Sequence, residues 1–129
     1  MDELLSEIKL PGAQGMPGEK EAFSICTLLE EHKAIDVIAL DLRELFLWTD
    51  FFIIATVSSE THQEGLLRHI KDYAVKEGLI IQRRTKREES GGWNLIDMGT
   101  MIIHLMNAPS RDFYELEKLW SSAKKIYPA

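Results

Sequence analysis

The sequence predicts an α/β domain in which a mixed five-stranded sheet is flanked by helices. Apolar runs of strand length alternate with segments whose apolar residues recur at helical spacing. These segments follow one another in the order α-β-β-α-β-β-β-α, which is typical of helices packed on a sheet. A chain of 129 residues is long enough for one compact domain with a single core. We therefore expect one domain over residues 19–129, preceded by an extension over residues 1–18.

The extension differs from the rest of the chain in its pattern. Leu4, Leu5, Ile8 and Leu10 predict at most one or two amphipathic turns. The following residues, 11–18, are rich in glycine and proline, which continue neither a helix nor a strand. We expect a flexible extension with a Gly/Pro linker, unless its apolar residues dock on the domain.

The first half of the domain begins with a predicted helix over about residues 19–33, in which four apolar residues have helical spacing. Two near-continuous apolar runs, 35–42 and 51–57, suit strands that are covered on both faces. The connection between them contains the apolar stretch 45–48, Leu-Phe-Leu-Trp. This stretch is too apolar for a loop in solvent, and we expect part of it to pack against the domain.

A second helix is predicted between a pair of serines and a glycine. Ser58 and Ser59 supply hydroxyls for its N-cap, and Gly78 supplies its C-terminal cap. A third strand is expected over residues 79–85. The path from the strand at 51–57 through this helix to the third strand is the candidate βαβ crossover.

The last third of the domain predicts a hairpin and a helix. Strands at 93–97 and 100–106 flank Met98-Gly99, where glycine permits the positive φ of a tight turn. Asp112 with Glu115 predicts a capping box that opens a helix to about residue 126. At about 100° per residue, its core face contains Phe113, Leu116, Leu119, Trp120, Ala123 and Tyr127. Tyr114 falls outside this face and is expected to be an exposed interface anchor.

Charge and cysteine usage exclude several classes of protein. The formal net charge of −6 argues against a protein that binds nucleic acid by itself, and it fits a basic protein partner. The single cysteine, Cys26, fits a reducing cytoplasm and is predicted to be a buried, inert thiol. No basic segment with an apolar run opens the sequence, and no apolar run has the length of a membrane span.

The hairpin and the last helix bring together residues that a small core does not require. Trp93, Asp97, Tyr114 and Glu117 are expected in one neighbourhood, and Leu116 lies at its boundary with the core. Aromatic and charged side chains without an accompanying catalytic motif favour a recognition surface over an active site.

Catalytic and metal chemistry has weak support in the sequence. Asp41, Asp50 and Asp97 are conceivable magnesium carboxylates, but Asp41-Leu42-Arg43 breaks the Asp-x-Asp pair that nucleotidyl transfer requires, and no glycine-rich loop precedes a helix. His104 in its apolar strand is predicted to be a hydrogen-bonded core or edge histidine. We predict no catalytic residue, no metal and no cofactor.

Three ordered motifs carry a family resemblance. They are Thr49-Asp50 with the apolar strand after it, Gly92-Trp93-x-Leu95-Ile96-Asp97-x-Gly99, and Arg111-x-Phe113-Tyr114-x-Leu116-Glu117-x-Leu119-Trp120. Over about residues 22–127 the chain resembles the ribosomal silencing factor family, also called Iojap-like. The resemblance implies a fold similar to a nucleotidyltransferase core without its catalytic motif. It also implies a translational repressor that binds protein number fourteen of the large ribosomal subunit and blocks joining of the small subunit when nutrients are short.

The resemblance also implies a contact surface. Carried over by position, the surface comprises Trp93, Asp97, Met98, Arg111, Tyr114, Leu116 and Glu117. Met98 stands where the family usually has tyrosine. The basic cluster Arg83, Arg84, Lys86 and Arg87 is expected to make at most a minor contact with ribosomal RNA. A homodimer through residues 45–48 and a sheet edge is compatible with this function, and a nucleotide-binding or nucleotidyltransferase-like enzyme on the same fold is the alternative.

Overall fold

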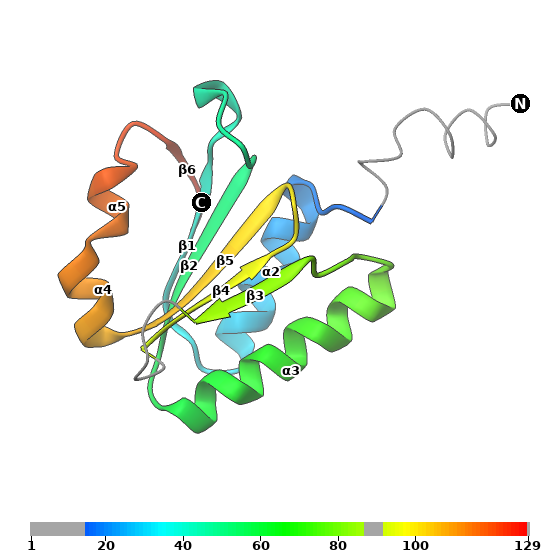
Figure 1. The fold of residues 1–129 in the computed structure, drawn as a ribbon, viewed down its shortest axis with the longest axis vertical. Helices are drawn as coiled ribbons and strands as arrows, with labels where there is room; N and C mark the ends of the chain where they lie inside the picture. The colour runs from blue at the N-terminus through cyan, green and yellow to red at the C-terminus, as the bar shows by residue number, and fades with distance from the viewer. Residues whose placement is uncertain (1–14, 87–91, 129) are drawn as a thin grey trace, which may run out of the picture.

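The computed structural model describes residues 15–86 and 92–128 (Figure 1). Over these residues the chain forms a mixed sheet of six strands in the order β3-β4-β5-β2-β1-β6. The mixed α/β class is confirmed, but the prediction of five strands was wrong. The elements are α2 (Glu19–Glu31), β1 (Ile35–Asp41), the 3-10 turn η1 (Arg43–Leu45), β2 (Phe51–Val57), α3 (Glu60–Glu77), β3 (Arg83–Lys86), β4 (Trp93–Asp97), β5 (Met101–Asn107), α4 (Ala108–Tyr114), α5 (Leu116–Leu119) and β6 (Lys124–Tyr127).

The sheet is centred on β2 and β5, which pair in parallel, while β1–β2, β1–β6, β3–β4 and β4–β5 are antiparallel pairs. The predicted crossover from β2 through α3 reaches a parallel strand, but β4 and β5 lie between β2 and β3. α2 and α3 cover one face of the sheet, and α4 and α5 lie on the other side (Figure 1).

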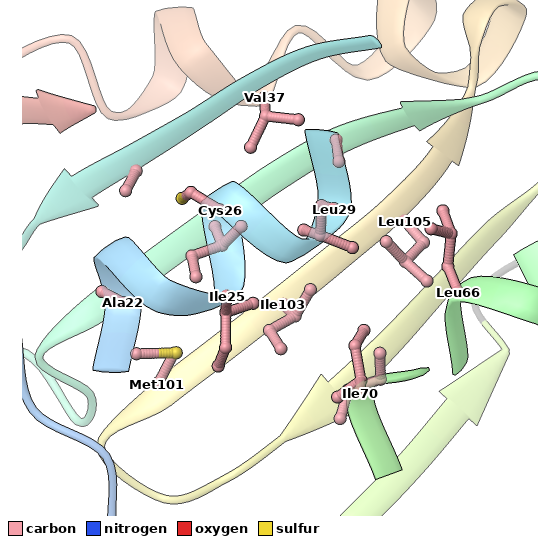
Figure 2. Close-up of a cluster of buried hydrophobic side chains, with 14 of the residues drawn as sticks. Ala22, Ile25, Cys26, Leu29, Val37, Leu66, Ile70, Met101, Ile103 and Leu105 are labelled. Atoms are coloured by element: carbon pink, nitrogen blue, oxygen red, sulfur yellow. The ribbon is translucent and has the colours of Figure 1, made fainter. Parts of the chain in front are cut away.

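The larger core lies between the sheet and the helices α2 and α3. Figure 2 shows the apolar side chains of α2 directed toward Val37 of β1 and toward β5, and those of α3 directed toward Leu105. Cys26 is fully buried in this layer, as predicted, and burial raises the pKa of its thiol to about 12. β2 is buried along its whole length, whereas β1 is exposed at Ile35 and Asp36, so the prediction of two covered faces holds for β2 alone.

Local signals place the ends of α3 and the hairpin as predicted. The Ser59 hydroxyl accepts a hydrogen bond from the His62 N–H at 3.0 Å, and Gly78 ends α3 with φ +69°. Gly99 occupies the β4–β5 turn with φ +83°. The third strand begins at Arg83 and not at residue 79, because the Leu79 and Ile80 N–H groups donate to the Ala74 and Gly15 carbonyls, and contact with β4 starts only where the Gln82 N–H donates to the Asp97 carbonyl.

The predicted helix over residues 112–126 is wrong. α4 begins four residues earlier, because the Asn107 side chain accepts from the Ser110 N–H at 2.9 Å and Pro109 lies in the first turn. Glu115 has a left-handed backbone, φ +48°, that separates α4 from α5 and excludes the expected capping box. The end of the predicted helix instead forms β6, which satisfies the backbone groups of β1.

The core face assigned to that helix is confirmed only in part, because Leu116 is buried and Trp120, Ala123 and Tyr127 pack against the core, while two of its residues do not. The side chains of Phe113 and Leu119 are 79% and 70% exposed, and Trp120 is half-buried. Tyr114, expected to be an exposed anchor, packs on Trp93 with a ring-centroid distance of 4.6 Å. Assigning side chains to helix faces by a constant angle per residue fails here, because the break at Glu115 changes the direction of the helix axis.

Candidate functional site

The sheet face that carries α4 and α5 is only partly covered by these short helices. Strand alternation directs Trp93, Leu95 and Asp97 of β4 toward this face, and Asn94 and Ile96 toward α3 and the larger core. Beside α5 the uncovered part forms a groove of about 520 Å³. The groove is lined by Trp48, Phe52, Arg83, Thr85, Trp93, Leu95, Asp97, Ile102, His104, Leu116, Leu119 and Trp120.

Aromatic rings build one wall of this groove. Phe52 has edge contacts with Trp48, Trp120 and His104, at centroid distances of 6.1, 5.6 and 4.7 Å. His104 is buried in its strand and accepts a hydrogen bond from the Trp93 indole N–H at 3.2 Å, which confirms the prediction of a hydrogen-bonded core histidine. This hydrogen bond fixes the orientation of the Trp93 ring at the end of the groove.

The groove is apolar at its base and exposed at its rim. Leu95, Ile102 and Leu116 are buried, whereas Trp48 is 66% and Leu119 is 70% exposed. The rim also carries one charge of each sign, because Arg83 of β3 lies opposite Asp97 of β4 in the ladder. The Asp97 carboxylate accepts from the Gly99 N–H at 2.8 Å, which holds it at the turn. Such an arrangement suits recognition of an apolar or aromatic surface.

A second hollow, of about 920 Å³, lies between α4, α5 and the start of β1, and it contains Arg111 and Glu117. The Arg111 side chain is only 9% exposed and donates to the Thr56 hydroxyl at 2.9 Å and to the Ile35 carbonyl. Its guanidinium is 3.1 Å from the Glu117 carboxylate. Arg111 therefore ties α4 and α5 to the sheet, a structural role that the sequence did not predict, and its contact with a partner stays a prediction.

The predicted site residues separate into groups in the structure. Trp93, Asp97 and Leu116 line the groove, Tyr114 supports Trp93, and Glu117 faces the second hollow. The structure corrects the assignment of Met98 to the contact surface, because its side chain is completely buried in the core on the α2/α3 face and offers no surface to a partner.

Sequence reasoning missed Trp48 and Leu119 as site residues. The apolar stretch 45–48 was the available signal for Trp48, since Leu45 and Leu47 pack against the core on this face while Phe46 and Trp48 stay exposed. Arg83, Arg84 and Lys86 are exposed on β3. Arg87 and residues 1–14 lie outside the residues that the structure describes.

Neither metal coordination nor a membrane span has support in the described part of the chain. Within residues 15–86 and 92–128, no group of three or more His, Cys, Asp or Glu side chains is placed to hold a metal ion. No helix within these ranges has the length and apolar character needed to cross a bilayer.

Comparison with known proteins gives consistent similarities. The family model described as "Ribosomal silencing factor during starvation" matches residues 17–128. A ribosomal silencing factor of Bacillus subtilis is 32% identical over 73% of this chain and 79% of its own length. The mouse protein named "Mitochondrial assembly of ribosomal large subunit protein 1" is 29% identical, over 75% of this chain and 43% of its own length. A crystal structure of a Chromobacterium violaceum protein superposes with a TM-score of 0.71 at 29% identity, over 81% of this chain and 88% of that one.

Proposed function

Because the chain belongs to the ribosomal silencing factor family, we propose that it represses translation by binding the large ribosomal subunit and preventing the small subunit from joining. The observation that carries this proposal is the exposed apolar groove between α5 and the sheet, whose wall and rim contain Trp48, Trp93 and Leu119. Three of the residues that the family resemblance assigns to a partner, Trp93, Asp97 and Leu116, line this groove. The name of the mouse relative, which refers to the ribosomal large subunit, supports the choice of subunit.

The proposed mechanism is steric. Protein number fourteen of the large subunit inserts an apolar surface into the groove, and the bound domain then occupies the place that the small subunit requires. Such occlusion needs no bond making or breaking, so the function proposed is that of a non-enzymatic regulator. The proposed place of action is the cytoplasm, where the ribosomal subunits are.

Charge supports the choice of a basic ribosomal protein as the partner. The chain has a formal net charge of −6, which attracts a basic protein over long range. Asp97 at the groove rim offers its carboxylate to a cation of the partner, whereas Glu117 already pairs with Arg111 of the same domain. Arg83, Arg84 and Lys86 on the edge strand β3 provide the minor contact with ribosomal RNA phosphates.

Exposed apolar residues on the two sides of the molecule allow a matched test. Leu119 lies in the last turn of α5 at the groove, and Val75 lies near the end of α3 on the opposite side of the sheet. Their exposed fractions are 70% and 82%, so replacement of either changes the unfolding free energy by only about 0.5 kcal/mol. Leu119→Lys places a cation against the basic partner, and Val75→Lys is its control.

The assay is co-sedimentation with purified large subunits, followed by a subunit-joining assay with added small subunits. Loss of a buried apolar anchor costs about 2 kcal/mol, or roughly thirtyfold in affinity. We expect Leu119→Lys to lose binding and the block on joining, while Val75→Lys retains both. Equal retention by the two variants would remove the groove from the binding surface, and failure of the unmodified protein to bind would refute the proposed function.

A further inference from the structure

The connection between β1 and β2, residues 42–50, carries an aromatic side chain that the fold does not use. Phe46 is 92% exposed, the largest exposed fraction among the exposed large apolar residues of the described chain. The connection projects past the end of the sheet (Figure 1), which leaves the ring open to solvent. Single exposed apolar residues are common, so this exposure indicates a function only together with further observations.

The backbone of Phe46 supplies a second observation. Its φ and ψ are +53° and +45°, in the left-handed region that a bulky residue rarely adopts, because the Cβ atom then lies too close to the following carbonyl oxygen. Glycine or asparagine occupies such a position with less strain. Phenylalanine is thus poorly suited both to this turn and to solvent exposure, and strain of this kind collects at functional sites.

The rest of the connection holds Phe46 in a fixed place. The Leu42 N–H donates to the Asp50 carbonyl at 2.7 Å and closes the connection at its base. Leu45 and Leu47, on either side of Phe46 in the sequence, pack against the core on the α4/α5 face. A ring presented from a fixed base loses less conformational freedom when a partner buries it, which favours binding.

The connection is continuous with the groove. Trp48, two residues after Phe46, lines the groove and makes edge contacts with the rings of Phe52 and Trp120. A partner that fills the groove covers Trp48 and therefore comes within two residues of Phe46. The same partner is then the one that the exposed ring of Phe46 meets.

Charge indicates what surrounds the ring on the partner. Arg43 is paired with Asp41 and with Glu19, at an N···O distance of 2.7 Å in both contacts. Glu44 is exposed, and it has no ion pair within the described residues. The connection therefore presents an aromatic ring beside an uncompensated carboxylate. This combination fits an apolar pocket bordered by lysine or arginine, which a basic protein can offer.

We propose that Phe46 is a second anchor for the large-subunit partner and inserts into an apolar pocket of the same basic protein that fills the groove. This inference rests on the proposed function and adds to it a contact outside the groove. The left-handed backbone at Phe46 keeps the ring away from the core and ready for the partner. The strain at this residue is therefore retained for binding and not for folding.

The substitution Phe46→Asn tests this proposal, because asparagine tolerates a left-handed backbone and lacks the ring. We expect the melting temperature to rise by about 2–5 °C, since strain is relieved and little burial is lost. Affinity for purified large subunits is expected to fall about ten- to thirtyfold. Phe46→Tyr keeps the ring and is expected to retain binding. A folding defect would lower stability and affinity together, so opposite changes are specific to an anchor.

Lys33→Asn is the matched control. Lys33 is also exposed and has a positive φ, +74°, but it lies in the turn before β1, at the other end of that strand from residues 42–50. We expect a similar rise in melting temperature and unchanged affinity for large subunits. Unchanged affinity of Phe46→Asn, or a fall in its melting temperature, would overturn the second anchor while binding by the unmodified protein leaves the proposed function standing. Failure of the unmodified protein to bind would refute the proposed function itself.

Cross-linking identifies what the ring contacts. A benzophenone amino acid is placed at position 46, and in a second variant at position 48 to mark the occupant of the groove. Both variants are irradiated in complex with large subunits, and the products are mapped by mass spectrometry. We expect both positions to cross-link to one ribosomal protein. Cross-links from position 46 to ribosomal RNA, to a different ribosomal protein or to a second copy of the chain would overturn the proposal.

Discussion

Replacement of Arg111 by methionine tests whether this residue holds the fold or contacts a partner. Methionine keeps an apolar stem of similar length in a site where the arginine side chain is only 9% exposed. The substitution removes the hydrogen bond to the Thr56 hydroxyl, the weaker one to the Ile35 carbonyl, and the ion pair with Glu117. All three contacts connect α4 to other elements, so their loss is expected to loosen the α4–α5 segment.

The magnitude follows from the burial of each partner. Thr56 is 7% exposed, and a buried hydrogen bond from a charged donor contributes about 1.5–3 kcal/mol. Glu117 is 42% exposed, so solvent screens its ion pair to about 0.2–1 kcal/mol. Arg111→Met is therefore expected to lower the unfolding free energy by about 2–4 kcal/mol. Glu117→Gln is expected to lower it by less than about 1 kcal/mol, because the arginine retains its other two acceptors.

The assay is urea unfolding monitored by far-ultraviolet circular dichroism, with linear extrapolation to zero denaturant. Binding to large subunits is measured in parallel at a temperature at which both variants are folded. A loss below about 1 kcal/mol for Arg111→Met would refute the structural role. An equal loss for Glu117→Gln would show that the ion pair, and not the buried hydrogen bond to Thr56, carries the stabilisation.

Three further outcomes are expected. Gly99→Ala and Gly78→Ala each lower the unfolding free energy by about 1–2 kcal/mol in urea unfolding, because both positions have positive φ and the Cβ added at Gly99 lies 2.7 Å only from the end of the flexible, exposed Gln82 side chain, which can move away. A loss at Gly99 that exceeds the loss at Gly78 by more than about 2 kcal/mol would contradict this. Gln63→Leu lowers the unfolding free energy by about 1–3 kcal/mol, because the buried Asn94 amide loses the acceptor that lies 2.5 Å away. The double variant Gln63→Leu/Asn94→Leu is expected to recover part of this loss, and a loss equal to the sum of the two single variants would refute the pairing. The buried Cys26 thiol is expected to resist a disulfide reagent in the folded protein at about pH 8, and rapid labelling of the folded protein would contradict its burial. Because burial raises the pKa of this thiol to about 12, the unfolding free energy falls as the pH rises from about 9 toward 12.

The candidate site was predictable from the sequence where strand alternation alone decides which way a side chain points. Trp93, Leu95 and Asp97 alternate along β4, and a hairpin around Gly99 fixes their register against β5. Trp48 and Leu119 reach the groove from a loop and a short helix that are separated by about seventy residues of chain. Their meeting depends on how α5 packs on the sheet, which no local pattern encodes.

The sequence by itself determined the elements that short-range chemistry defines. The Ser59 cap and Gly78 bound α3, Gly99 permits the hairpin turn, and the apolar runs mark β2 and β5. The end of the chain was decided by tertiary structure. Residues 124–127 have a helical pattern in the sequence, yet they form β6 because β1 would otherwise present an unpaired edge, and pairing with it satisfies backbone groups that a continued helix would leave open. The left-handed turn at Glu115 then separates α4 from α5, leaving Leu119 exposed beside the groove and Trp120 in its aromatic wall.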